Sequence, residues 1–201
     1  MEYPRFFRLC WDNLLTLIGL NLLFLACSIP LVTLPASLTA LAGAGQALIE
    51  GEGAALRRFL EVFRRELFRA MPAGFAMLLL EAAALWGCLF YRGFTGLLPT
   101  ALSVFCLLCA YIVFCAGAYC FNMLARIELG FAGLVRNSFA LVFMFPRPLF
   151  TWLLLSFMLP LAGLFLLPHS LPLLALLLIS ASGLAASRGT LPAVFEYVER
   201  K

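Results

Sequence analysis

Long apolar stretches, separated by short segments that hold most of the arginines, constrain the fold of this chain more than any other feature. Hydrophobic residues make up 64% of its 201 residues and charged residues 12%. A membrane-crossing helix needs about 20 apolar residues, and in hydrocarbon a helix bonds its backbone polar groups internally. We expect one integral membrane domain (residues 1–201), an all-α compact bundle of five to six transmembrane helices arranged as hairpins, with cytoplasmic amphipathic segments.

Five apolar segments have roughly the length of a transmembrane helix. They lie at about 13–34, 72–91, 97–124, 148–167 and 171–187, with charges, prolines and glycines between them. A sixth segment, residues 36–49, is rich in alanine, glycine and serine and would rise only about 21 Å as a helix. It either crosses the bilayer with help from residues 31–34 or forms a re-entrant segment.

The basic residues predict the orientation, because loops rich in Lys and Arg stay in the cytoplasm. After Arg5 and Arg8, all of them except Arg92, which lies by a predicted external loop, form three groups: Arg57, Arg58, Arg64, Arg65 and Arg69; Arg126, Arg136 and Arg147; and Arg188, Arg200 and Lys201. Two predicted crossings separate each of these groups from the next. We therefore predict a multi-pass protein with both termini in the cytoplasm.

Residues 56–71 have the pattern of an amphipathic helix. The side expected to face inward is apolar, with residues at three- and four-residue spacing: Leu56, Phe59, Leu60, Phe63, Leu67 and Ala70. The opposite side carries the charged pairs that Glu61 forms with Arg57 and Arg65. Such a helix is either a connector at the membrane surface or a docking site for a cytoplasmic partner. The residues predicted to contact lipid or that partner are Arg57, Arg58, Arg64, Arg65 and Arg69.

A faint internal repeat has an offset of 80 residues. Gly53, Phe59, Val62 and Phe63 align with Gly133, Phe139, Val142 and Phe143. If the repeat is real, residues 53–124 and 133–188 are two copies of an amphipathic helix followed by a hairpin.

Glu81 lies near the middle of a predicted span, where an ionisable group costs free energy unless it is paired, neutral or in contact with water. It is either a proton-coupling or substrate-binding carboxyl, or a hydrogen-bonded residue between helices with Asn122 or Asn21 as its partner. A Glu81 that lines a polar cavity with one of these asparagines favours transport. A Glu81 capped by its neighbours, with no cavity, favours a scaffold.

The segment Ser28–Ser37 predicts a break in a helix, because Pro30 removes a backbone donor and clashes with the preceding turn. The hydroxyls of Ser28 and Thr33 can bond the freed backbone groups, and Pro35 follows closely. The segment is either a broken helix that lines a cavity, as in many transporters, or the turn of the first hairpin, which we favour.

The sequence offers no catalytic, cofactor-binding or metal-binding set of residues, so we expect a protein that is not an enzyme. It contains neither a phosphate-binding glycine loop nor a nucleophile elbow. His169 is its single histidine, and its seven cysteines fall almost entirely within apolar runs, as small packing residues do. No nucleic-acid-reading module accompanies the basic charge.

Four elements of the first 70 residues form a recognisable set: Trp11-Asp12-Asn13, Asn21-Leu22-Leu23, the turn Ser28–Ser37, and the glycine-containing linker into the helix with Phe59 and Phe63. With these elements the chain resembles, over essentially its whole length, the YesL-like family of uncharacterised bacterial integral membrane proteins. The resemblance implies a bacterial plasma membrane and a frequent association with ATP-driven (ABC-type) carbohydrate importers.

We therefore predict a non-enzymatic accessory or scaffold subunit for oligosaccharide uptake. Its partners would be the lipid bilayer and the permease or ATPase subunits of an importer. The alternative is a small independent transporter or channel that uses Glu81. The run Ala42-Gly43-Ala44-Gly45 would permit close helix contact within one chain or in a homo-oligomer.

Overall fold

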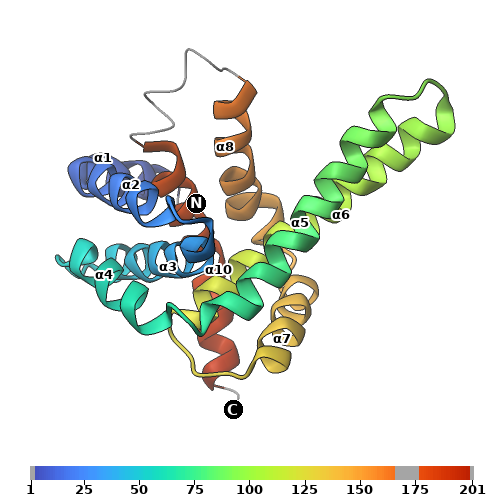
Figure 1. Cartoon of the computed structure of the whole chain (residues 1–201). Coiled ribbons are helices and arrows are strands. Elements are labelled where there is room, and N and C mark those ends of the chain that lie inside the picture. The colour runs from blue at the N-terminus through green and yellow to red at the C-terminus, as the bar shows by residue number, and fades with distance from the viewer. Residues whose placement is uncertain (1–2, 166–176, 200–201) are drawn as a thin grey trace.

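The computed structural model describes residues 3–165 and 177–199, and within these ranges the regular structure is entirely helical (Figure 1). The elements are α1 (Tyr3–Asp12), α2 (Leu14–Ser28), the 3₁₀ turn η1 (Leu31–Thr33), α3 (Leu34–Glu50), α4 (Ala55–Glu66), α5 (Ala70–Arg92), α6 (Leu97–Leu124), α7 (Phe131–Met144), the π-helical turn η2 (Leu149–Leu153), α8 (Leu154–Phe165) and α10 (Ile179–Glu199). The all-α prediction is confirmed for this part of the chain.

In the described part of the chain, three helices are long and apolar enough to cross a membrane. They are η1 with α3, α5, and α6; the pair α1 and α2, bent by 79° at Asn13, would be a fourth. The turn η2 and α8 form a shorter apolar helix, and the predicted span 171–187 begins outside the described residues. The chain therefore has the apolar helices of a membrane protein, while five to six crossings stay a prediction.

The first predicted span, 13–34, extends beyond the end of the helix in the structure. The helix α2 stops at Ser28, and Pro30 is extended, with φ −76° and ψ 111°. The chain then resumes as η1 and continues directly into α3. Residues 31–34 thus belong to the second helix, which gains the 20 residues, about 30 Å, that a full crossing needs.

The helix α3 occupies the centre of the fold. It contacts α2, α4, α5, α6 and α10. In the most apolar stretch of η1 and α3, 72% is buried inside the protein. Small residues allow this approach. A Cβ added at Gly43 would lie 2.9 Å from Val62 of α4, and one added at Gly45 would lie 2.8 Å from Ser187 of α10. The small-residue run is therefore used for packing within the chain.

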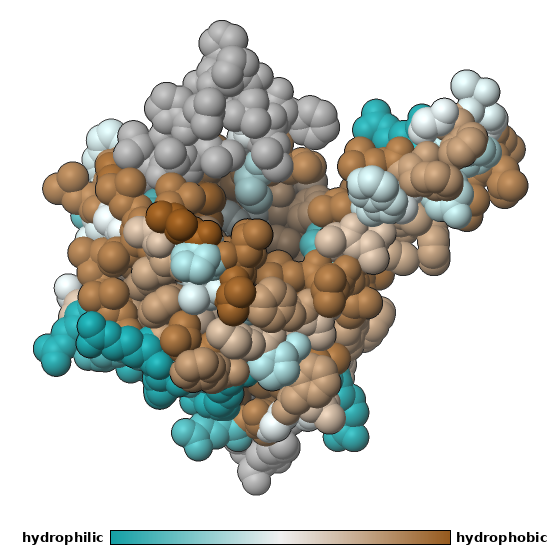
Figure 2. All heavy atoms as spheres, viewed as in Figure 1, coloured by the Kyte–Doolittle hydropathy of each residue, from teal (hydrophilic) through white to brown (hydrophobic). Residues whose placement is uncertain are grey.

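The helices α5 and α6 form a long hairpin that projects from the body of the molecule (Figure 1). Near its tip the Ser103 hydroxyl donates to the Cys88 carbonyl oxygen at 3.1 Å, which joins the two helices. Most of the face seen in Figure 2 is apolar, and the exposed side chains of the hairpin include Leu79, Trp86, Leu89, Phe90, Leu97, Phe105 and Leu108. Such a surface suits a lipid environment.

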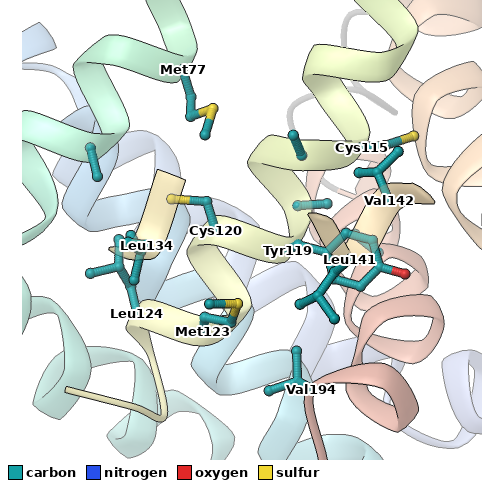
Figure 3. Close-up of a cluster of buried hydrophobic side chains, with 14 of the residues drawn as sticks. Met77, Cys115, Tyr119, Cys120, Met123, Leu124, Leu134, Leu141, Val142 and Val194 are labelled. Atoms are coloured by element: carbon teal, nitrogen blue, oxygen red, sulfur yellow. The ribbon is translucent and has the colours of Figure 1, made fainter. Parts of the chain in front are cut away.

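The base of this hairpin packs into a buried core with α7 and α10 (Figure 3). Tyr119, Cys115 and Cys120 of α6 are fully buried there, against Leu141 of α7 and Val194 of α10. These two cysteines act as small packing residues, as expected. Helix α4 lies in the first predicted copy of the repeat and α7, which is itself apolar, lies in the second. The second copy includes undescribed residues, so the repeat stays a prediction.

Candidate functional site

A cavity of about 250 Å³ lies where α3, α5, α6, α8 and α10 meet. Its wall is mostly apolar, with Leu41 and Phe121 among the lining residues. Four polar side chains also line it: Glu81, Asn122, Ser156 and Ser182. This lining resembles that of small-molecule sites, in which a few polar groups orient a ligand held by apolar contacts.

Glu81 contributes the one ionisable group among the residues that line this cavity. It lies midway along α5, and its Oε2 atom is buried without a hydrogen-bond partner in the described part of the chain. A buried acceptor without a donor is costly. The arrangement therefore leaves an acceptor at the cavity wall that a donor group from outside the chain can satisfy.

Asn122 lies in the same wall but bonds to α3 rather than to Glu81. The Gln46 side chain donates to the Asn122 carbonyl oxygen at 2.9 Å and to its Oδ1 at 3.0 Å. The Asn122 side chain in turn donates to the Ala118 carbonyl oxygen at 2.9 Å. Sequence reasoning missed Gln46, although it is the one amide side chain in the run 36–49.

Asn21, the other predicted partner, is not among the residues that line the cavity. It is fully buried on α2, and its Oδ1 accepts a hydrogen bond of 2.8 Å from the backbone N–H of Ser180, in the first turn of α10. An amide oxygen at this position satisfies one of the backbone donors that a helix start leaves free. The structure thus places Glu81 and Asn122 in the wall of one cavity, and joins Asn21 to the start of α10.

Ser156 and Ser182 form a reciprocal pair that joins α8 to α10 at the cavity wall. Each hydroxyl donates to the other residue's carbonyl oxygen at 2.8 Å. Because both hydroxyl protons are used within the chain, the pair can only accept further hydrogen bonds. These serines were not identified from the sequence.

The helix-break residues form the turn between α2 and α3. The Thr33 hydroxyl lies within hydrogen-bond distance of two carbonyl oxygens, that of Pro30 at 2.7 Å and that of Cys27. The Ser28 Oγ, in contrast, is buried without a partner among the described groups. Pro35 packs so closely on Gly74 of α5 that an added Cβ there would overlap its ring. None of the predicted break residues, Ser28, Pro30, Thr33 and Pro35, lines the cavity.

Two of the arginines hold the end of α6. Arg65 donates from Nη2 to the Ala125 carbonyl oxygen at 2.9 Å, and Arg69 donates from Nη2 to that of Ile127 at 2.6 Å. Both arginines also form ion pairs with Glu66, whose side chain is fully buried. The Glu66 Oε1 atom lies 2.7 Å from Arg65 Nε and 3.2 Å from Arg69 Nη1. Sequence reasoning missed Glu66, which occupies the buried face of α4.

The other arginines of this group lie nearer the solvent. Arg57 pairs with Glu61 at 3.0 Å on the surface, Arg58 is partly buried, and Arg64 is exposed. In Figure 2 hydrophilic side chains gather along the lower left, where Figure 1 places α4. Whether these side chains contact lipid or a partner stays a prediction.

The apolar face of α4 is rotated from the expected one. Ala55, Phe59, Val62 and Glu66 are buried, whereas Leu56 and Leu60 are each 39% exposed. The helix packs on α3, where Gly43 receives Val62, and this close contact decides which side of α4 faces inward.

Comparison with known protein families gives one match. Residues 17–88 match the model of a protein family of unknown function, DUF624. The matched region runs from α2 to α5 and includes the helix break, the arginine group and Glu81. No curated protein and no solved structure matches the chain. The family is uncharacterised, and the YesL-like name stays a prediction.

Proposed function

We propose that this membrane protein is a small independent transporter whose central cavity binds a mostly apolar molecule carrying a donor group. The observation that carries the proposal is the buried, unpartnered Oε2 of Glu81 at the wall of a cavity between five helices. Transporters commonly bind their substrates near the middle of the membrane, between groups of helices. The free-energy cost of a carboxyl group at that depth is lowest when a bound ligand or a proton neutralises its charge.

The size of the cavity limits the ligand. An apolar cavity of about 150 Å³ is known to hold benzene, so 250 Å³ accommodates a single ring with a short polar arm. It is too small for an oligosaccharide. The surface is hollowed between the α5–α6 hairpin and the body of the molecule (Figure 2), and a movement of the hairpin relative to the body would open the site.

The polar groups of the cavity define the chemistry of the ligand. Both serines already use their hydroxyl protons within the chain, and Asn122 uses one of its two N–H donors, so the cavity presents mainly acceptors. A cation with N–H groups matches a carboxylate best, because charge-assisted hydrogen bonds are the stronger ones. We therefore expect a ring-bearing cation, such as a guanidinium or an amine.

Binding of benzylguanidinium to the purified protein in detergent, measured by calorimetry, tests this site. Benzylurea has the same shape without the charge and is the matched control ligand. We expect benzylguanidinium to bind at least about tenfold more tightly than benzylurea, and Glu81→Gln to remove the difference. Equal binding of the two ligands to the wild-type protein would refute the role of Glu81.

A cavity-filling variant tests the location independently. Gly117 lines the cavity, and an added Cβ there meets its nearest neighbour, Phe121, only at 3.8 Å. Gly117→Leu should therefore fill the space without overlap and abolish binding of benzylguanidinium, while the protein stays folded and monodisperse. Wild-type affinity in this variant would place the ligand elsewhere.

A second candidate function is the accessory subunit for oligosaccharide uptake. It rests on the family resemblance and on the solvent-facing side of α4, where Arg57 and Arg64 accompany the partly exposed Leu60. In either proposal the protein lies in a bacterial plasma membrane with the arginine-rich segments and both termini in the cytoplasm.

Co-purification in mild detergent from the native host, grown on a complex polysaccharide, tests this candidate. Stoichiometric recovery of an importer permease or its ATPase would support it. The triple variant Arg57→Gln, Arg58→Gln and Arg64→Gln should then lose the partner. Recovery of this chain alone, as a monomer or a homo-oligomer, would count against it.

A further inference from the structure

A second hollow, of about 360 Å³, lies where the start of η2 meets the middle of α10. Its lining includes Arg147, Thr151 and Trp152 from the first of these regions and Arg188 and Gly189 from the second. It shares no lining residue with the central cavity. It is therefore a separate candidate site.

The lining of this hollow is positively charged. Two guanidinium groups, those of Arg147 and Arg188, reach it from segments far apart in the sequence, and no carboxylate of the described residues lines it. Pro148, which directly precedes η2, is also part of the wall. The helix that begins there, η2 continued by α8, adds the partial positive charge of its first turn.

Close packing holds the wall in place. An added Cβ at Gly189 would lie 2.8 Å from the Cβ of Trp152, so a glycine is needed for α10 to approach η2 this closely. The ring of Trp152 is fixed on its other side by Phe6, with ring centroids 4.8 Å apart. The two arginines therefore project from backbones whose separation is set by packing.

We infer that this hollow binds a phosphate group. The guanidinium fork matches two phosphate oxygens at once, and a tryptophan beside basic residues is typical of the boundary between membrane and water. Basic pockets between helices on the cytoplasmic side bind the headgroups of anionic lipids. The phosphate can belong to such a lipid or to a soluble phosphate compound.

Thermal unfolding of the purified, delipidated protein in a neutral detergent tests this inference. The additives are phosphatidylglycerol, phosphatidylcholine and sodium phosphate. We expect phosphatidylglycerol near 100 times its Kd to raise the unfolding midpoint by several degrees, and phosphatidylcholine to raise it less. If sodium phosphate also raises the unfolding midpoint, the hollow is a site for soluble phosphate compounds. If only the lipid raises the midpoint, the hollow is a lipid site.

Two variants and a control make the result specific. Arg147→Gln changes an exposed side chain and should reduce the rise, and adding Arg188→Gln should abolish it. Arg136→Gln removes an exposed arginine of α7 that does not line the hollow, and should leave the rise unchanged. The inference is overturned if no additive raises the midpoint, if both lipids do so equally, or if the rise persists in Arg147→Gln and the double variant.

Discussion

The side chain of Gln46 on the central helix α3 donates to both oxygens of Asn122 on α6, at 2.9 and 3.0 Å, within the buried interior. This pair joins the most buried of the apolar helices to the longest helix, directly beside the cavity that Asn122 lines. This amide pair therefore helps to fix the relative position of α3 and α6.

Replacement of Gln46 by methionine should destabilise the protein. The variant keeps the volume but leaves the Asn122 oxygens without a donor, which costs about 1–3 kcal/mol. Unfolding of the purified protein in detergent measures the loss. The double variant with Asn122→Leu should be less destabilised than the sum of the single variants, with a coupling of about 0.5–3 kcal/mol. Strict additivity would contradict a direct interaction.

Replacement of Glu66 by glutamine should be more damaging than any surface charge change on α4. It removes the buried partner of Arg65 and Arg69, and breaking such a network costs about 3 kcal/mol or more. Glu61→Gln is the matched control, because Glu61 pairs with Arg57 on the surface, where a pair contributes at most about 1 kcal/mol. Equal unfolding midpoints for the two variants would show that Glu66 is not structurally important.

Gly74 and Gly133 should respond in opposite directions to substitution by alanine. The added methyl group at Gly74 would overlap Pro35 and force α5 away from α3, at a cost of about 1–3 kcal/mol. At Gly133, on α7, it meets nothing within 4 Å, and alanine should stabilise the helix by roughly 0.5–1 kcal/mol. A stable Gly74→Ala variant would argue against the close α3–α5 contact.

The helical class and the positions of the apolar segments follow directly from hydropathy. Pro30 also indicated the end of α2 correctly, because a missing backbone donor acts locally. The end of the first span was placed six residues too late, at residue 34 instead of Ser28, since residues 31–34 are as apolar as those before the break. Hydropathy cannot assign such residues to one of two consecutive helices.

The contacts that organise the site depend on residues far apart in the chain, and local pattern could not reveal them. In the sequence Glu66 looks like a surface charge within a group of five arginines. It becomes a buried partner only because the end of α6, about 60 positions later, lies next to it. Asn122 was singled out, but its partner Gln46 was not. Glu81 was identifiable because a carboxyl group stands out in an apolar span.

Uptake of labelled benzylguanidinium into proteoliposomes is the most direct test of the central claim, that Glu81 and its cavity form a transport site. The guanidinium group stays charged at neutral pH, so leakage through lipid is slow. We predict uptake at least about tenfold faster than in protein-free vesicles, and a return to that background in Glu81→Gln. Uptake by Glu81→Gln at the wild-type rate, or no uptake above background by the wild-type protein, would contradict the claim.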